Sequence, residues 1–399
     1  MITKLWPAVF FGKIHNNVLV HNIMPIKFAL LDFKWYIFFI LLCHFYLSKR
    51  YLEKKNYTIK EIAKLAEVSR GTVDRILHQR GNVSEKARQK VEGILKRIDY
   101  SPNIIARSLK ANKRSRIVAI LPSNEKDNYW NQSINGILEA AKKANEFNVT
   151  IEIKKYDIAN VDLFSHLIDK LLENPPNGIL LAPLFYHESL DFLAKCIAAK
   201  IPYVLFNTHI EDSQSLCFIG QDLFASGRVS ADLLNRIKIP GKKMLIIHFD
   251  EDPAIANHLK EKEIGFRQYF KEKGEKAELQ TMRLSSKQGN HVEEKIAEIF
   301  AHDDLGGIYV STSKAHVIAD YLKRNSLHHI PLIGYDLIDQ NIRFLKSGEI
   351  NFLINQNPKR QTYLGISYLS DFLVFGKKIE RTNLLPLDII TVENLAFYL

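Results

Sequence analysis

The sequence predicts a small all-helical head followed by a large α/β body. The head is indicated by two short helical segments with their own start signals, separated by only three residues, between Thr58 and Leu77. The body is indicated by strand-like and helix-like runs that alternate from Arg116 to the end of the chain, a pattern typical of βαβ units and parallel sheets. A chain of 399 residues is long enough for two or three domains.

The first 51 residues differ in composition from the rest of the chain. Residues 28–47 are strongly apolar, but three polar side chains interrupt them, and a spanning helix needs roughly 20 clean apolar residues. One interpretation is a membrane anchor, since Lys49 and Arg50 would hold the body in the cytoplasm. A cleaved signal peptide is a second, although no small-residue cleavage site follows. We favour a third interpretation, in which residues 1–51 precede the true start and are not part of the native protein.

Positive charge is concentrated near the start of the chain. Residues 51–116 carry 17 Lys and Arg against 7 Asp and Glu, a net charge of +10. The whole chain has a net charge of +11, of which residues 1–50 contribute +5, so residues 117–399 sum to −4. A basic head on a mildly acidic body predicts a polyanionic partner for the head alone.

Residues 57–101 carry the start signals of three helices. Thr58 and Glu61 form a capping box, so a first helix should run to about Glu67. Ser69 can cap a second helix and Ser84 a third. Because so few residues separate the first two helices, the turn between them must be tight, and the pattern predicts a helix-turn-helix.

In a helix-turn-helix, the second helix lies in the major groove and its N-terminal residues face the base edges. Those residues are Arg70, Gly71, Thr72, Asp74 and Arg75. Arginine suits guanine, whereas Asp74 would repel phosphates but can accept a hydrogen bond from cytosine. Hydroxyl side chains near the helix starts suit phosphate contacts, namely Thr58, Ser69, Thr72 and Ser84. The alternative is a three-helix bundle whose basic faces are merely solvated.

A further short helix is expected after Pro102, which ends the third helix. Asn103 can cap it, but it would span only about two turns, and an isolated helix of that length is marginal in water. It should therefore form only when DNA or a second copy of the chain stabilises it.

Residues 57–110 resemble the DNA-binding head of the lactose-repressor (LacI) family. Four motifs fall at the family's positions: T-I-K-E-I-A, V-S-R-G-T-V-D-R, V-S-E-K-A-R and Y-S-P-N-x-x-A-R-S-L. The resemblance implies that residues 102–115 form a hinge helix and linker that enter the minor groove. Asn103, Ala106 and Leu109 would then contact DNA, with Leu109 as the wedge that partly unstacks a base step and bends the duplex.

Four positions depart from the family pattern. Glu67 stands where the turn usually has Gly, which costs ~1–2 kcal/mol if the backbone there is left-handed. Gly71 and Asp74 replace longer neutral or hydroxyl side chains, so the operator sequence cannot be carried over from relatives. Lys262 stands where the family usually has Arg and cannot reproduce a bidentate grip, which leaves the ligand class open.

The body is predicted element by element. The expected strands are Ile117–Leu121, Thr150–Lys154, Gly178–Ala182, Tyr203–Phe206, Met244–His248, Gly307–Val310 and Pro331–Gly334. The expected helices include Ile134–Phe147, Leu163–Leu172, Leu190–Lys200, Phe224–Ile237 and His291–Phe300. In parallel sheets, ligands bind beyond the carboxyl ends of the strands, so polar residues there are candidate contacts.

The order and spacing of these runs resemble the sensor of the same family, which is similar to periplasmic sugar-binding proteins. The resemblance implies a sensor over residues 116–399 with two α/β lobes and a ligand cleft. The first lobe would comprise about 116–221 and 357–384, and the second about 222–356 and 385–399. The three crossings between the lobes would then lie near Gln221–Asp222, Gln356–Asn357 and Leu384–Pro386.

Eleven residues are candidate ligand contacts: Asn128, Tyr129, Trp130, Asn207, Gln221, Asp222, Lys262, Ser311, Ser313, Asp336 and Gln356. The aromatic rings at Tyr129 and Trp130 would stack on a sugar ring, and the amides and carboxylates would hold its hydroxyls. The alternatives are structural: a packed Trp130, a turn or cap at Asn207, and a helix cap at Ser313.

These patterns together predict a cytoplasmic, ligand-responsive transcription factor of the repressor type. It would pair as a homodimer or tetramer on a near-palindromic operator and respond to a sugar or sugar derivative. A membrane-tethered or periplasmic solute-binding protein is the alternative, but it leaves the basic head unexplained. An enzyme is a third class, and no phosphate-binding loop or nucleophile elbow supports it. Cys43, Cys196 and Cys217 lack metal-ligand spacing, and we expect neither a metal nor a cofactor.

Overall fold

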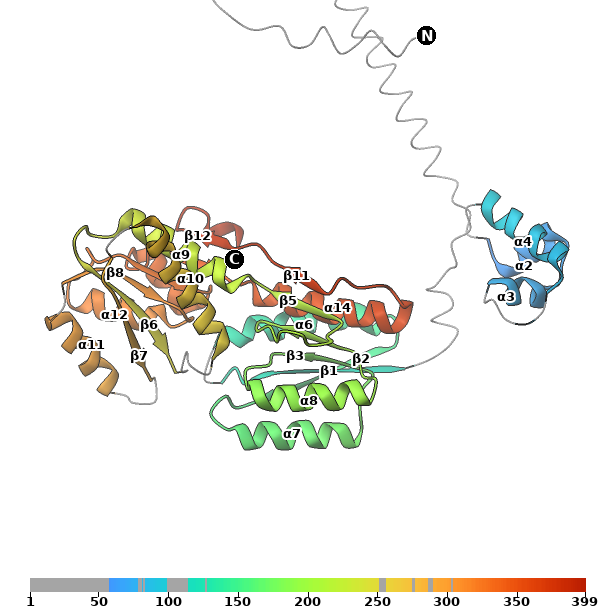
Figure 1. Cartoon of the computed structure of the whole chain (residues 1–399), viewed down its shortest axis with the longest axis horizontal. Helices are drawn as coiled ribbons and strands as arrows, with labels where there is room; N and C mark the ends of the chain where they lie inside the picture. The colour runs from blue at the N-terminus through green and yellow to red at the C-terminus, as the bar shows by residue number, and fades with distance from the viewer. Residues whose placement is uncertain are drawn as a thin grey trace, which may run out of the picture. The chain divides into compact units, whose positions relative to one another are not determined.

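A computed structural model of the chain describes residues 57–77, 81, 83–98, 114–125, 128–250, 256–274, 277–285, 290–302 and 304–399. They belong to two compact units, within residues 1–103 and 104–399 (Figure 1). The apolar segment near the start, and the expected hinge helix with Asn103, Ala106 and Leu109, lie outside the described residues. Among the described residues, no helix is long and apolar enough to cross a membrane.

The described residues of the head form three helices, α2 (Ile59–Ala66), α3 (Arg70–Leu77) and α4 (Glu85–Arg97). Their apolar faces bury one small core made of Ile62, Ala63, Ala66, Val73, Ile76 and Val91. The predicted helix-turn-helix is confirmed, because α2 and α3 pack against each other and both contact α4.

Local capping explains where the head helices begin. The Glu61 amide donates to Thr58 Oγ1 at 3.2 Å and the Thr58 amide to Glu61 Oε2 at 2.8 Å, which is the predicted capping box. The Thr72 amide donates to Ser69 Oγ at 3.1 Å and so starts α3. Glu67 is left-handed, with φ of 53°, and as a non-glycine residue it carries a strain of ~1–2 kcal/mol.

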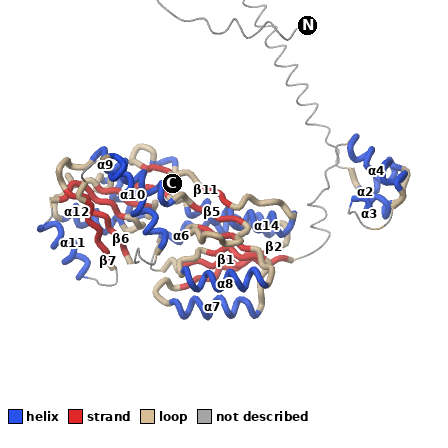
Figure 2. The backbone as a smooth tube through the Cα atoms, in the orientation of Figure 1, coloured by secondary structure: helices blue, strands red, loops and turns tan. Residues whose placement is uncertain are grey.

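The body contains two six-stranded sheets (Figure 2). The first has the order β11-β5-β4-β3-β1-β2. Its strands are β1 (Ser115–Pro122), β2 (Val149–Tyr156), β3 (Gly178–Leu181), β4 (Tyr203–Phe206), β5 (Cys217–Gly220) and β11 (Thr382–Leu384). Its helices are α6 (Tyr129–Asn145), α7 (Val161–Glu173), α8 (Tyr186–Ala198) and α14 (Pro358–Phe375). Helices α6 and α14 cover one face, and α7 and α8 cover the other (Figure 1).

The second sheet has the order β12-β10-β9-β8-β6-β7. Its strands are β6 (Lys243–Phe249), β7 (Leu279–Leu284), β8 (Leu305–Val310), β9 (Leu332–Tyr335), β10 (Phe352–Asn355) and β12 (Asp388–Ile390). Its helices are α9 (Leu223–Ile237), α10 (Asn257–Lys273), α11 (Asn290–His302), α12 (Ala315–Arg324) and α13 (Asp339–Ser347). Helices α9 and α10 cover one face and α11 to α13 the other. All its strand pairs are parallel except β10 with β12.

The chain passes from one sheet to the other at three places: between β5 and α9, between β10 and α14, and between β11 and β12. Each sheet with its helices therefore forms one lobe of the body. The parallel strands run towards the crossings, so the loops at their carboxyl ends from both lobes face the same region.

Helices α9 and α10 cross with their backbones in contact. A Cβ placed on Gly227 of α9 would lie 1.9 Å from the Lys262 carbonyl oxygen of α10. A Cβ on Gly265 of α10 would lie 2.0 Å from the Phe224 carbonyl oxygen of α9. Two glycines therefore set the distance between these helices, and with it the position of Lys262.

Candidate functional site

A cavity of about 70 Å³ lies between the two lobes of the body, at the carboxyl ends of their strands. Eight of the eleven predicted ligand contacts line it: Tyr129, Trp130, Asn207, Lys262, Ser311, Ser313, Asp336 and Gln356. They come from the segments that follow β1, β4, β8, β9 and β10, and from α10. Five lining residues were not predicted, namely Ile158, Leu184, His258, Leu259 and Thr312. The sequence did not indicate these residues as ligand contacts, because three of them are apolar and His258 and Thr312 lie in no recognisable motif.

The second lobe contributes a buried polar cluster. Lys262 Nζ donates to the Ser311 carbonyl oxygen at 3.1 Å and to Gln356 Oε1 at 3.3 Å. It also lies 3.8 Å from the centre of the Tyr335 ring, a cation–π contact. The side-chain Nε2 of Gln356 donates to Asp336 Oδ2 at 2.8 Å, and the backbone amide of Gln356 donates to Asp336 Oδ1 at 3.3 Å. A buried ammonium and a buried carboxylate are thus held in fixed positions through one glutamine.

The backbone at Asp336 explains how its carboxylate is positioned. Asp336 is left-handed, with φ of 70°, which few side chains tolerate. Asn341 Nδ2 donates to the carbonyl oxygens of Asp336 at 3.1 Å, Tyr335 at 2.8 Å and Ser313 at 2.8 Å. One asparagine of α13 therefore holds the loop after β9 against the loop after β8. The sequence did not indicate a role for Asn341, because an asparagine within a helix and outside any motif has no distinguishing sequence context.

The first lobe contributes an aromatic and amide side. Asn207 is left-handed, and its Nδ2 donates to the Tyr129 hydroxyl at 2.7 Å. The backbone amide of Asn207 donates to Gln361 Oε1 of α14 at 2.8 Å. Trp130 is 4 % exposed and lies edge-on to both Tyr129 and Phe206, with ring centres 4.9 and 6.3 Å apart. Trp130 therefore both packs in the lobe core and forms part of the cavity wall.

Three predicted contacts lie outside this cavity. Asn128 precedes α6, and its Oδ1 accepts from Asn131 Nδ2 at 3.3 Å. Gln221 lies at the crossing between β5 and α9, where its Nε2 donates to the carbonyl oxygens of Asn355 at 3.0 Å and Pro386 at 2.6 Å. Asp222 caps α9 by accepting from the Ala225 amide at 2.8 Å. Gln221 thus ties the three crossings together rather than facing the cleft.

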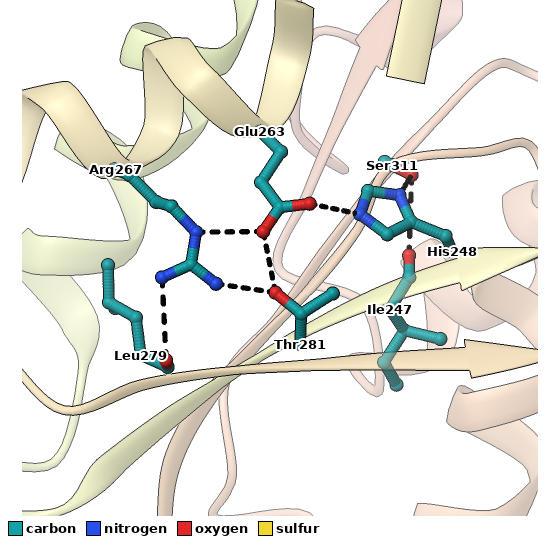
Figure 3. A network of polar contacts seen from close by, with 7 residues as sticks. All are labelled: Ile247, His248, Glu263, Arg267, Leu279, Thr281 and Ser311. Atoms are coloured by element: carbon teal, nitrogen blue, oxygen red, sulfur yellow. Dashed lines mark hydrogen bonds and ion pairs between the residues drawn. The ribbon is translucent and has the colours of Figure 1, made fainter. Parts of the chain in front are cut away.

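A network of polar contacts ends at Ser311, which lines the cavity (Figure 3). His248, at the end of β6, is fully buried, with Nδ1 2.7 Å from Ser311 Oγ and Nε2 2.8 Å from Glu263 Oε2. Glu263 Oε1 accepts from Arg267 Nε at 2.7 Å and from Thr281 Oγ1 at 2.6 Å. The network connects α10 and β7 to Ser311, whose carbonyl oxygen holds the Lys262 ammonium.

The ionisation of Glu263 is part of this network. Burial acts to raise the pKa of Glu263, but hydrogen bonds from His248, Thr281 and Arg267 outweigh it and lower the pKa from 4.5 to about 2. Because the folded-state pKa is depressed, the stabilisation by the Glu263 carboxylate is fully present above pH 4.5. It is lost as the pH falls towards 2.

The change Glu263→Gln should therefore lower the free energy of unfolding near neutral pH by about 3 kcal/mol, because an ionised, hydrogen-bonded carboxylate is removed. The difference between wild type and variant should shrink as the pH falls from about 4.5 to about 2, where the wild-type carboxyl is also neutral. Urea unfolding of both proteins across this range measures it. A difference that stayed constant with pH would show that the Glu263 charge does not stabilise the fold.

The residues predicted to contact bases lie on α3. Arg70, Gly71, Asp74 and Arg75 are exposed, and Thr72 is half-buried. Arg75 Nε donates to the Gly71 carbonyl oxygen at 3.1 Å, and Ser69 Oγ lies 2.9 Å from Thr72 Oγ1. Thr58 uses its hydroxyl in the capping box, whereas Ser84 stands at the N-cap of α4 with no side-chain cap hydrogen bond. Four of the five predicted base-contacting residues are thus exposed on α3.

Two family comparisons match separate parts of the chain. Residues 58–103 match the family described as "Bacterial regulatory proteins, lacI family". Residues 118–378 match the family described as "Periplasmic binding protein domain". Together these matches cover the head and most of the body.

Individual relatives are similar over both parts. The chain is 24% identical over 297 residues to the ribose operon repressor of Lactococcus lactis subsp. lactis, covering 71% of this chain and 82% of that protein. It is 25% identical over 289 residues to the sucrose operon repressor of Streptococcus mutans, covering 70% and 82%. Among solved structures, a candidate LacI transcriptional regulator from Bacteroides fragilis is 29% identical with a TM-score of 0.68, covering 72% of this chain and all of that one.

Transport proteins share the fold of the body. A carbohydrate transporter solute binding protein from Agrobacterium radiobacter, in complex with D-arabinose, superimposes with a TM-score of 0.61 at 19% identity. The superposition covers 71% of this chain and 97% of the transport protein. From the head motifs and the two-lobed body together, the chain belongs to the LacI family of DNA-binding bacterial regulatory proteins, with a sensor of the periplasmic binding protein type.

Proposed function

We propose that this protein is a cytoplasmic repressor that binds a near-palindromic operator as a homodimer and responds to a sugar or sugar derivative. The observation that carries the proposal is the pairing, in one chain, of a basic helix-turn-helix with a two-lobed body whose strand ends bring eight polar or aromatic contacts to one cavity. The body alone does not distinguish a regulator from a transport protein, and the basic head makes that distinction.

The chemistry of the cleft supports a polyhydroxyl ligand. Asp336 and Gln356 offer acceptors and a donor on one wall, and Asn207 offers an amide on the other. Paired acceptors and donors of this kind suit neighbouring hydroxyl groups, and the aromatic walls suit a sugar ring. The names of the ribose and sucrose operon repressors agree with this class.

The cavity must enlarge to admit such a ligand. Its volume of about 70 Å³ is well below the roughly 300–1,000 Å³ of typical ligand pockets. Since its walls belong to both lobes, the lobes must separate for entry and close around the ligand. Ligand binding therefore requires a change in the angle between the two lobes.

That change is the proposed signal to the head. The segment 99–113 joins head and body, and the hinge helix expected there is marginal by itself. A coupling free energy of ~1–3 kcal/mol between ligand binding and hinge formation is enough to shift operator affinity 5- to 150-fold.

Two measurements on the chain from residue 52 onward test the proposal. Genome-wide mapping of bound DNA should reveal one recurring near-palindromic sequence. Calorimetric titration with D-ribose, D-arabinose, D-galactose and sucrose, and with sugars suggested by neighbouring genes, should identify a ligand that changes operator affinity. Sugar binding without any preferred DNA sequence would instead support a solute-binding protein.

Arg75 should contribute to base recognition. We expect Arg75→Ala to weaken operator binding by about 1–3 kcal/mol and to relax preference at one base position, because a bidentate contact to guanine is lost. Selection of binding sites from a random pool measures the preference. Lys60→Ala, on the exposed face of α2, is the control and should weaken binding evenly for all sequences if Lys60 contacts phosphate. An unchanged sequence preference for Arg75→Ala would contradict a role in base reading.

A further inference from the structure

Gln361 lies in the first turns of α14, just after the second crossing between the lobes. It is 1 % exposed and does not line the cleft cavity, yet both ends of its side-chain amide are used. Its Oε1 accepts from the backbone amide of Asn207 at 2.8 Å, and its Nε2 donates to the Gln356 carbonyl oxygen at 2.8 Å. One buried side chain therefore holds the backbone of two residues that do line the cleft cavity.

The orientation of the Gln361 amide is fixed by its partners. A backbone N–H can only donate and a carbonyl oxygen can only accept, so turning the amide over would place donor against donor and acceptor against acceptor. The Asn207 N–H also lies 3.1 Å from the Ile219 carbonyl oxygen, so Gln361 supplies the nearer of two acceptors. The side chain of Asn207 in turn donates to the Tyr129 hydroxyl. Gln361 thus helps to hold the first-lobe wall of the cleft.

At its other end, Gln361 holds the backbone of the second crossing. Gln356 faces the second lobe with its side chain and its backbone amide, which both donate to Asp336. The same side chain accepts from the Lys262 ammonium. Its carbonyl oxygen, in contrast, accepts from Gln361 of the first lobe. A continuous series of buried hydrogen bonds therefore runs from one wall of the cleft to the other through Gln361 and Gln356.

We propose that Gln361 is a positioning residue that couples the two walls of the cleft. It fixes Asn207 relative to Gln356, and through Gln356 relative to Asp336. A displacement of one wall is transmitted to the other, because buried donors and acceptors lose their partners if only one wall moves. A ligand that orders one wall thereby preorganises the other. This consequence for ligand binding rests on the function proposed above, whereas the coupling itself does not.

Amide hydrogen exchange of the full chain, resolved by residue and measured without ligand or DNA, tests the coupling. Gln361→Met keeps an unbranched side chain of similar length but removes the amide. It should speed exchange of the Gln356 amide at least about fivefold, although Asp336, the acceptor of that amide, is unchanged. Asp336→Ala should speed exchange of the Asn207 amide, in the other lobe, at least about fivefold.

A double variant and a control separate coupling from a general loss of stability. If both substitutions break one path, Gln361→Met/Asp336→Ala should exchange at Asn207 within about twofold of Gln361→Met alone. Thr362→Val changes the next residue of α14 and removes a buried hydroxyl that donates to the Ser133 carbonyl oxygen at 2.8 Å. This control should leave exchange at Asn207 and Gln356 as in wild type.

Three results would overturn the proposal. The first is exchange of the Gln356 amide in Gln361→Met within about twofold of wild type. The second is an equal acceleration in that variant at the amides of β3, in the core of the first lobe, since this would indicate only a loss of stability. The third is wild-type exchange of the Asn207 amide in Asp336→Ala, which decides the question even if Gln361→Met does not fold. Neither ligand nor DNA enters these measurements, so their failure is distinct from a failure of sugar or operator binding.

Discussion

Gly227→Ala is expected to lower the free energy of unfolding of the body by about 3 kcal/mol. The added methyl carbon would lie 1.9 Å from the Lys262 carbonyl oxygen, 2.8 Å from its carbonyl carbon and 3.0 Å from the Phe266 amide nitrogen. All three atoms belong to the backbone of α10, so no side chain can move aside. The helices must separate, and the core between them and the second sheet loosens.

The same substitution should also weaken ligand binding in the cleft. The carbonyl that the methyl group would strike belongs to Lys262, whose ammonium holds the Ser311 carbonyl and Gln356. Displacing α10 would therefore weaken ligand binding as well as stability. Urea unfolding followed by circular dichroism measures the first effect, and calorimetry measures the second.

Gly93→Ala is the matched control. Gly93 lies within α4, and an added Cβ there meets no atom within 4 Å. Alanine should then stabilise that helix by roughly 0.5–1 kcal/mol, because glycine is a poor helix former. If Gly227→Ala unfolded at the same urea concentration as wild type, the tight crossing of α9 and α10 would not exist in solution.

Asp336→Ala is expected to reduce the affinity for the cleft ligand at least about 100-fold, close to 3 kcal/mol, while leaving operator affinity without ligand unchanged. The substitution removes the acceptor of both the Gln356 side chain and the Gln356 amide. The hydrogen-bonded series from Lys262 through Gln356 to Asp336 would lose its carboxylate. Calorimetry with the sugar identified by titration measures ligand affinity, and fluorescence anisotropy measures operator affinity.

Asp336→Asn separates charge from backbone strain. Asparagine tolerates the left-handed conformation at this position, with φ of 70°, better than alanine does. It should therefore unfold like wild type yet bind ligand more weakly, because the carboxylate charge is gone. A ligand affinity for Asp336→Ala within about twofold of wild type would remove Asp336 from the site.

The head and the main strands were predictable because their signals are local. The capping box at Thr58, the start at Ser69 and the apolar pattern of α2 and α3 lie within twenty residues of each other. The seven predicted strands are confirmed: six are short, mainly apolar runs that become buried in a parallel sheet, whereas β2 alternates apolar and polar residues at a sheet edge.

The missed elements depend on partners distant in sequence. β11 and β12 are three residues each and pair only at the edges of their sheets. β7 has one partner strand and a half-exposed, partly polar sequence. Helix α10 carries charged side chains on most turns, and only its contact with α9 explains why its glycine and phenylalanine positions are buried.

The cleft followed from one topological rule. Carboxyl ends of parallel strands meet at one edge, and this brought Asn207, Ser311, Asp336 and Gln356 together although they are spread over about 150 residues. The rule does not tell which way a crossing residue points, and so Gln221 and Asp222 were expected in the cleft but line a separate cavity beside the crossing between β5 and α9. The His248–Glu263 pair has no motif in the sequence, because its members become neighbours only when β6 and α10 pack.

Sequence-specific binding of DNA by the basic head is the claim on which the regulatory account depends. The direct measurement is the affinity of the chain from residue 52 onward for a DNA site selected from a random pool and for its scrambled version, over a series of salt concentrations. We expect a preference for the selected site of at least about 10³-fold and a binding constant that falls steeply as salt rises. Equal affinity for the two sequences, or no binding to either, would contradict it.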